Sequence, residues 1–166
     1  MTENSVITRT RRVKLCLASS DATKPLAPIT HIALGTGGAD ADGEPLAPTD
    51  DMTALRSEVV RYPVDSVSYP VDTTARYSVT IPRDEQSGVS FSEAALVDSD
   101  GDIVAIKTMY PKRKDPGVAF TFEFDDEFYG GATWLISITR SRKIRYLTSK
   151  PSAASSTTTP SMPTRS

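Results

Sequence analysis

The sequence predicts a mainly β fold, an antiparallel β-sandwich of about six to eight strands with one or two short helices. Three observations support this prediction. Short segments in which apolar and polar residues alternate recur along the chain. Twelve prolines and nine glycines favour many turns over long helices. An Asp-Gly pair, Asp100-Gly101, separates two apolar segments and is typical of a tight β-hairpin.

The 166 residues are enough for one domain and a tail. Residues 1–12 are polar and end in a basic stretch, so we expect an N-terminal arm there. We expect the β-rich domain to span 13–148 and a Ser/Thr/Pro-rich tail to span 149–166. Twelve of the 16 residues from Pro151 to Ser166 are Ser, Thr or Pro. Such a segment buries too little apolar surface to offset the entropy lost on ordering.

The charge and the lack of long apolar segments argue against nucleic-acid and membrane partners. The formal net charge is −2, whereas a nucleic-acid-binding domain usually carries a basic surface. No segment approaches the roughly 20 apolar residues that a membrane span needs. The first ten residues lack the apolar run of a signal peptide. We therefore expect no nucleic acid and no membrane among the partners, and synthesis in a cytoplasm.

The first half of the chain contains one apolar run, one strand and one helix-start signal. The run Val13–Ala18 alternates loosely, and it is compatible with a strand or a short helix. Ile29–Gly35 predicts a strand that enters a glycine-rich turn. Thr49, followed by two aspartates, is a helix-capping pattern. It predicts a short helix over 50–57 with one apolar face, formed by Met52, Leu55 and Val59.

The second half alternates as strands do. Val60, Tyr62 and Val64 share one side of a predicted strand, and Pro63 marks its edge or end. The segment from Glu93 to Ile106 predicts a hairpin that turns at 98–101. Three further strands are predicted from their alternating residues: Tyr77, Val79 and Ile81; Phe120, Phe122 and Phe124; and Trp134, Ile136 and Ile138.

The residue types leave little room for catalysis. His31 is the only histidine and Cys16 the only cysteine, which excludes multi-histidine sites, thiolate clusters and an intrachain disulfide. We interpret Cys16 as a small buried hydrophobic residue and His31 as a structural or strand-edge residue. The Gly-x-Ser-x-Gly pattern of a nucleophile elbow is absent from the sequence. We therefore predict no catalytic residue and no enzymatic activity.

Four further patterns have the residue types of a binding site. Asp98, Asp100 and Asp102 resemble the start of a calcium loop, but Gly101 falls between the second and third aspartates. A solvated hairpin turn is the expected structure, with an adventitious cation as the alternative. The glycines of 35–38 lack the lysine of a phosphate loop. Residues 125–127 are acidic and are expected to be solvated, and the basic stretch 140–150 suits either solvent or an acidic partner. We predict no cofactor and no metal.

Several short motifs resemble the phage tail-collar fibre family, the N-terminal regions by which tail fibres attach to a baseplate. The segment 29–37, Ile-Thr-His-Ile-Ala-Leu-Gly-Thr-Gly, resembles the family pattern I-T-x-I-A-x-G-x-G. The pattern L-x-x-E-x-x-R follows. After it come a glutamate, a small residue followed by a leucine, and a hairpin that contains a glycine. The residues that carry the resemblance are Ile29, Thr30, Ile32, Gly35, Gly37, Leu55, Glu58, Arg61, Glu93, Leu96 and Gly101. The chain departs from the family in having Ala94-Ala95 where a glycine is usual after the glutamate.

The resemblance covers about residues 29–106, and it implies assembly residues and no catalytic ones. It implies a structural component of a phage tail, or of a phage-tail-like contractile particle, that links baseplate and tail fibre and serves host attachment. The partners would be other tail or baseplate subunits and further copies of the chain, with a trimer as the expected homo-oligomer. The protein would be made in the host bacterial cytoplasm and located in the virion tail. The alternative is a free carbohydrate- or protein-binding β-sandwich, in which Tyr69, Tyr110 and Tyr129 would form one exposed platform.

Overall fold

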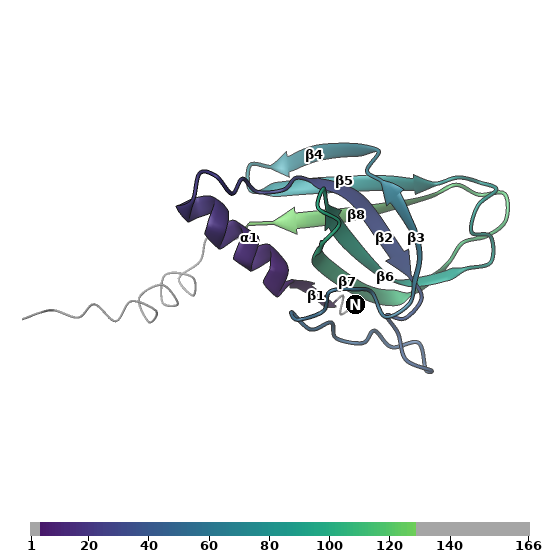
Figure 1. The fold of residues 1–166 in the computed structure, drawn as a ribbon. Coiled ribbons are helices and arrows are strands. Elements are labelled where there is room, and N and C mark those ends of the chain that lie inside the picture. Colours follow the sequence, from purple (N-terminus) through teal and green to yellow (C-terminus); the bar gives the residue numbers. More distant parts are fainter. Residues whose placement is uncertain (1–3, 129–166) are drawn as a thin grey trace, which may run out of the picture. The chain divides into compact units, whose positions relative to one another are not determined.

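A computed structural model describes residues 4–128, which form two antiparallel sheets and one helix (Figure 1). The order along the chain is β1 (Asn4–Ile7), α1 (Arg9–Ser20), β2 (Ile29–Gly35), β3 (Glu58–Pro63), β4 (Ser66–Val71), β5 (Thr74–Ile81), β6 (Ser90–Asp98), β7 (Ile103–Arg113) and β8 (Phe120–Glu127). The mainly β sandwich predicted from the sequence is confirmed.

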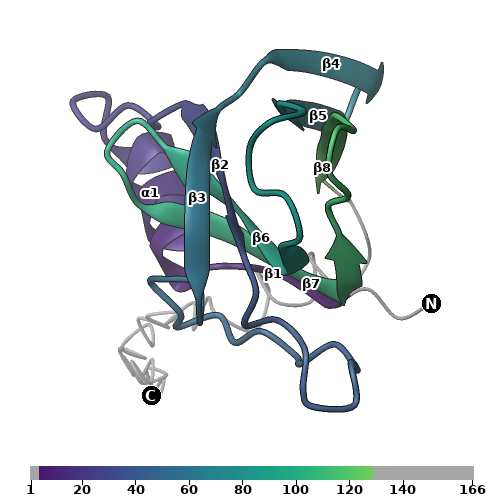
Figure 2. The ribbon, with the colours of Figure 1, turned by 90° about the vertical axis from the view of Figure 1, so that its right-hand side faces the viewer.

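The five-stranded sheet has the order β1-β7-β6-β2-β3, and the three-stranded sheet has the order β4-β5-β8. Figure 2 shows the two sheets facing each other, with the chain crossing from β3 to β4 at one corner. On the opposite side of the sandwich, β8 is the outer strand of its sheet among the described residues. The chain also passes between the two sheets from β5 to β6 and from β7 to β8.

The core between the sheets is built from the alternation seen in the sequence. Ile32 and Leu34 of β2 and Val79 and Ile81 of β5 point inward and are at most 1% exposed. Phe122 of β8 packs edge-to-face on Phe91 of β6, with ring centroids 5.7 Å apart. Burying an aromatic side chain of this kind stabilises a fold by about 1.5–3 kcal/mol.

The other face of the five-stranded sheet is also buried. It carries a second apolar cluster around Ala33, Ala95, Val97 and Ile106. Leu55, from the long connection between β2 and β3, covers this cluster together with Met52 and Val6. β6 lies in the middle of the sheet and is buried on both faces, which explains its unbroken apolar run Ala94–Val97.

α1 begins at a buried cap beside β7. The Thr8 side chain is 0% exposed and accepts a hydrogen bond from the Arg11 amide at 3.2 Å. Its hydroxyl donates to the Ile103 carbonyl at 2.8 Å, so the cap also fixes the helix to the sheet. Within residues 4–128, no helix has the length and apolar character that crossing a bilayer requires.

Three expectations differ from the structure. Residues 50–57 form turns rather than a helix. Cys16 is exposed on α1 rather than buried, because the helix contacts the five-stranded sheet through Thr8 and Lys14 and β8 through Arg11. The segment 1–12, expected as an arm, contributes β1 and the start of α1 from Asn4 onward. The strand predicted at Trp134–Ile138, the basic stretch 140–150 and the tail 149–166 lie outside the described residues.

Candidate functional site

Two motif glycines, Gly35 and Gly37, lie against the carboxylate of a third motif residue, Glu93, which is 0% exposed on β6. Its Oε1 atom accepts hydrogen bonds from the backbone N–H groups of Gly37 at 3.0 Å and Ser57 at 2.7 Å. Its Oε2 atom accepts one from the Arg56 N–H at 3.1 Å. A carboxylate can accept several hydrogen bonds, and these three satisfy a group whose burial would otherwise be costly. Glu93 therefore joins both ends of the connection between β2 and β3, residues 36–57.

The glycines at the end of β2 leave room for this joint. A Cβ atom at Gly37 would lie 2.6 Å from the Arg56 Cβ, and one at Gly35 would lie 2.6 Å from the Glu93 Oε1. A Cβ at Gly38 would collide with the Ser92 carbonyl, while the Gly38 N–H donates to the Ser92 hydroxyl at 2.9 Å. Close approach of the backbone, and not a positive φ angle, explains these glycines.

The remaining motif residues of β2 and β6 serve packing and turns. Ile32 of β2 faces Leu96 of β6 across the ladder, and both are fully buried. Ile29 starts β2 opposite Asp98, and the Thr30 hydroxyl lies 2.9 Å from the His31 Nδ1. These contacts hold β2 and β6 in register within the sheet.

Gly101 and Leu55 complete the structural set. Gly101 has φ +89°, so it provides the left-handed residue of the β6–β7 turn. Leu55 is 6% exposed in the second apolar cluster, where it holds the connection down on the sheet.

Glu58 and Arg61, the charged residues of the L-x-x-E-x-x-R motif, form an ion pair within β3. The Arg61 Nε and Nη2 atoms donate to the two Glu58 carboxylate oxygens, both at 3.0 Å. This hydrogen bonding raises the pKa of Arg61. The pair is partly exposed, so its contribution to stability is about 0–1 kcal/mol.

The three aspartates of the β6–β7 turn converge on a lysine of α1. The Lys14 Nζ atom lies 2.5 Å from Asp98, 2.8 Å from Asp100 and 2.7 Å from Asp102. Asp98 is buried and also accepts the N–H groups of Asp100 and Asp102. Burial lowers the pKa of Lys14, but the three carboxylates outweigh it and raise the pKa overall. A side-chain ammonium thus stands where a calcium loop would place its ion, a contact that the sequence patterns did not predict.

Residues 1–118 match the family described as phage tail-collar fibre protein, N-terminal. The chain belongs to the phage tail-collar fibre family. No curated protein and no solved structure shows significant similarity to the chain. The match covers β1, α1 and most of the two sheets, a longer part of the chain than the motifs alone had indicated.

Membership in the phage tail-collar fibre family gives the protein its general role. The family is structural and not enzymatic, as the sequence had led us to expect. Membership assigns the chain to the tail of a bacteriophage virion, where it interacts with other tail components. The buried Glu93 joint, solvent-inaccessible and bound only to backbone groups, fits such a structural role.

The tyrosine platform of the alternative prediction does not form within residues 4–128. Tyr69 lies on β4 in the three-stranded sheet, whereas Tyr110 lies on β7 in the other sheet. The Tyr110 hydroxyl donates to Glu44 at 2.9 Å, and that hydrogen bond raises its pKa. Tyr129 lies outside the described residues.

Proposed function

We propose that this chain links the baseplate of a phage tail, or of a phage-tail-like contractile particle, to a tail fibre and so serves host attachment. It is made in the host bacterial cytoplasm and works as a homo-oligomer, with a trimer as the expected form. The observation that carries the proposal is the connection 36–57. It has neither helix nor long strand, yet both of its ends are fixed to Glu93. Long ordered loops on a rigid scaffold are the usual place for binding residues.

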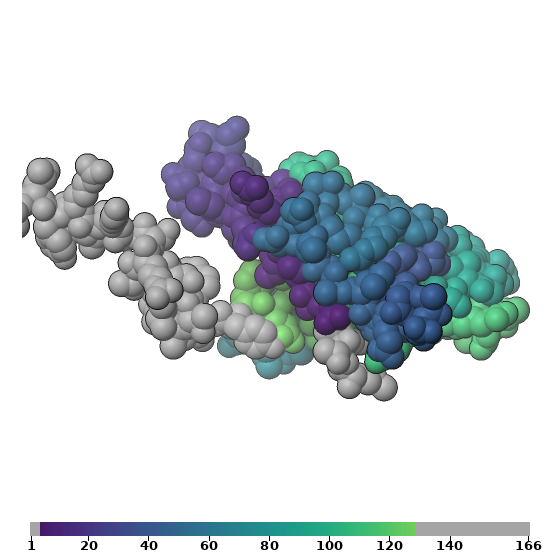
Figure 3. Space-filling model, turned by 90° about the horizontal axis from the view of Figure 1, so that it is seen from below, coloured from purple at the N-terminus to yellow at the C-terminus, as the bar shows by residue number. Residues whose placement is uncertain are grey.

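The tip of this connection is ordered and acidic. The Asp40 carboxylate accepts the N–H groups of Asp42 at 3.0 Å and Glu44 at 2.9 Å. The carboxylates of Asp40, Asp42 and Glu44 all lie on exposed residues. Figure 3 shows the connection, coloured blue, on the surface beside the purple N-terminal segment, and the Asn4 side chain donates to the Pro45 carbonyl at 3.4 Å. We propose that this tip contacts a basic surface of a neighbouring tail subunit, because opposite charges set register and encounter rate.

The test is a charge reversal at the tip. Asp42→Lys changes an exposed side chain whose carboxylate holds no contact within the tip, so the fold should be unaffected. Particles purified from a producing host should contain several-fold fewer copies of this variant than of the wild type. Asp72→Lys, an exposed acidic residue in the β4–β5 turn, is the matched control and should be incorporated normally.

Equal incorporation of both variants would show that the acidic tip is not the attachment surface. A wild-type chain that never co-purifies with any particle would overturn the linking function itself. The free carbohydrate- or protein-binding module would then replace it.

A further inference from the structure

β8 has a strand neighbour on one side only among the described residues. It pairs with β5 from Phe120 to Glu127, and its other edge faces an open groove. Successive parts of this groove have volumes of about 410, 360 and 230 Å³, and each is lined by residues of β8 together with residues of β7, β1 or both. Every second residue of an edge strand directs its N–H and C=O groups away from its partner, and native proteins usually pair or cover such edges.

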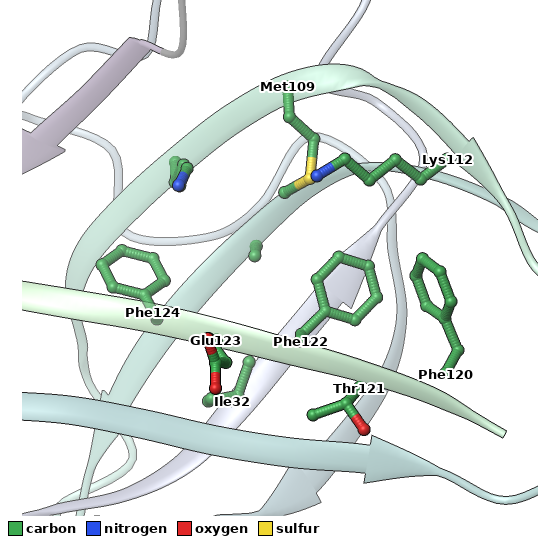
Figure 4. A pocket seen from close by; sticks show the side chains of 10 residues that line it. Ile32, Met109, Lys112, Phe120, Thr121, Phe122, Glu123 and Phe124 are labelled. Carbon is green, nitrogen blue, oxygen red and sulfur yellow. The ribbon is translucent and has the colours of Figure 1, made fainter. Parts of the chain in front are cut away.

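The side chains of β8 divide between the two faces of its sheet. Figure 4 shows the rings of Phe120, Phe122 and Phe124 on one side of the strand, and Thr121 and Glu123 on the other side. Phe122 and Phe124 are only 7% and 5% exposed, so the two sheets already cover these rings. The unmet requirement at this edge is therefore hydrogen bonding of its backbone.

The sequence directly after β8 predicts a strand that can meet this requirement. The apolar residues Trp134, Ile136 and Ile138 recur at every second position, as they do in a strand. The short segment 128–131, which contains two glycines, separates them from the end of β8. Two alternating segments joined by three to five residues with a glycine are the usual pattern of a β-hairpin.

We propose that residues 132–138 pair with the free edge of β8, antiparallel to it, as a further strand of the three-stranded sheet. The two strands would form a hairpin whose loop is Phe128, Tyr129 and Gly130. Hairpin loops of three residues usually end in a left-handed residue, a position for which glycine is best suited, and Gly130 takes it here. Glu127 then faces Gly131 across the base of the loop.

This loop length sets a register in which the two apolar rows meet. It places Trp134 opposite Phe124, Ile136 opposite Phe122 and Ile138 opposite Phe120. Cross-strand pairs of aromatic and β-branched residues stabilise a sheet. A register shifted by one residue would instead turn the whole row toward the face of Thr121 and Glu123, where it would gain no apolar partner. The turn glycine and the alternation thus agree on one arrangement.

The position of the segment in the chain favours it over any separate strand. Its first residue comes only five positions after Glu127, so it reaches the edge of β8 at a high effective concentration. A strand from another molecule would lose translational freedom on binding, which the tethered segment does not. Pairing within the chain would also remove an edge to which strands of other molecules could add.

An engineered disulfide tests the register in the full chain, after the native thiol is removed by Cys16→Ser. The proposed hairpin places Ser137 opposite Thr121 on the outer face, so Thr121→Cys with Ser137→Cys should form a bond within one chain. Thr80→Cys with Ser137→Cys is the matched control, because Thr80 pairs with Thr121 from the far side. It would lie roughly two strand spacings from residue 137, about 9–10 Å and beyond the reach of a disulfide. Non-reducing electrophoresis and thiol titration of the monomer compare the two.

Trp134 is the only tryptophan of the chain, and its fluorescence tests burial of the apolar row. In the native monomer, acrylamide should quench this fluorescence several-fold less than it does in urea. Ile136→Lys should raise the quenching toward the value in urea, because residue 136 faces Phe122. Ser137→Lys, one residue along and on the outer face, should leave it unchanged.

Three results would overturn the proposed strand. The first is equal quenching of Trp134 in native and unfolded protein. The second is a control pair of cysteines that bonds as readily as Thr121→Cys with Ser137→Cys. The third is that the latter pair forms no bond, or forms bonds only between two molecules.

Discussion

Among the individual residues, Glu93 and Asp98 of β6 are both acidic and both buried. Their carboxylates are stabilised in different ways. Glu93 accepts hydrogen bonds from backbone N–H groups of two chain segments. Asp98 accepts backbone N–H groups of its own turn and also contacts the Lys14 ammonium. Each carboxylate accepts hydrogen bonds from neighbouring N–H groups. Removing either carboxylate therefore leaves buried donors without an acceptor.

Glu93→Gln should destabilise the protein by about 1–3 kcal/mol, because the amide –NH₂ faces backbone donors and leaves one of them unsatisfied. Urea unfolding followed by circular dichroism measures the change. Glu123→Gln makes the same chemical change on a side chain that is 55% exposed, and it should stay within about 0.5 kcal/mol of wild type. Equal effects of the two substitutions would show that the Glu93 joint does not stabilise the fold.

Lys14→Met should remove a stabilising contact that depends on pH. The pKa of Lys14 is higher in the folded chain than its ordinary value of 10.5, so the contact stabilises the folded state fully below pH 10.5. This stabilisation is lost as the pH rises through the folded pKa. The difference in unfolding free energy between wild type and Lys14→Met should therefore be constant from pH 7 to 10 and shrink above that range. Lys24→Met, at an exposed position, should show no such difference.

The same substitution should create a cation site. Without the ammonium, three carboxylates whose oxygens lie within 4.8 Å of one another have no cationic partner. Oxygen ligands of this kind suit Ca²⁺. Millimolar Ca²⁺ should raise the melting temperature of Lys14→Met and leave that of the wild type unchanged. A variant that ignores Ca²⁺ would show that the turn rearranges when Lys14 is removed.

Among the structural elements, the hairpin formed by β6 and β7 depends on one glycine in its turn, Gly101. Apart from Gly101 and its two chain neighbours, no described atom lies within 4 Å of the place where a Gly101 Cβ would stand, so only its φ of +89° opposes a side chain. Gly101→Ala should cost about 1–2 kcal/mol in unfolding free energy. Gly101→Asn should cost less, because asparagine adopts left-handed backbone more readily. Similar losses for both variants would contradict this explanation.

Elements formed by local alternation were predictable from the sequence, and elements fixed by distant partners were not. β2, β5, β8 and the β6–β7 hairpin follow the alternation of their own residues. The helix predicted at 50–57 is absent because the Arg56 and Ser57 N–H groups bind Glu93, 36 or more residues away. β4 escaped prediction because it contains Pro70 and buries none of its residues. In the candidate site, the structure brings the motif residues Gly35, Gly37 and Glu93 together, whereas the contact between Lys14 and the three aspartates had no signal in the sequence patterns.

For the stability of the whole molecule, the N-terminal segment matters, because its described part, from Asn4 onward, belongs to the fold. β1 pairs with β7 from Asn4 to Ile7, and Thr8 caps α1 from a buried position. Deleting residues 1–10 should therefore destabilise the protein well beyond Thr8→Ala, which removes the cap alone at a cost of about 0.5–2 kcal/mol. Thr10→Ala is the control and should have little effect. Thermal unfolding followed by circular dichroism compares the three, and a deletion as stable as wild type would return this segment to the role of a free arm.

The way in which the connection 36–57 is anchored bears on how such a chain diversifies. Glu93 fixes its two ends, and Asp40 closes its tip through the N–H groups of Asp42 and Glu44. Lengthening a loop whose ends are already held costs little, about 0.6 kcal/mol for each doubling of its length. Insertions between 40 and 44 would thus be tolerated while the sheets stay unchanged. The sheets can thus serve as a constant scaffold, on which a new tip sequence gives a new binding specificity.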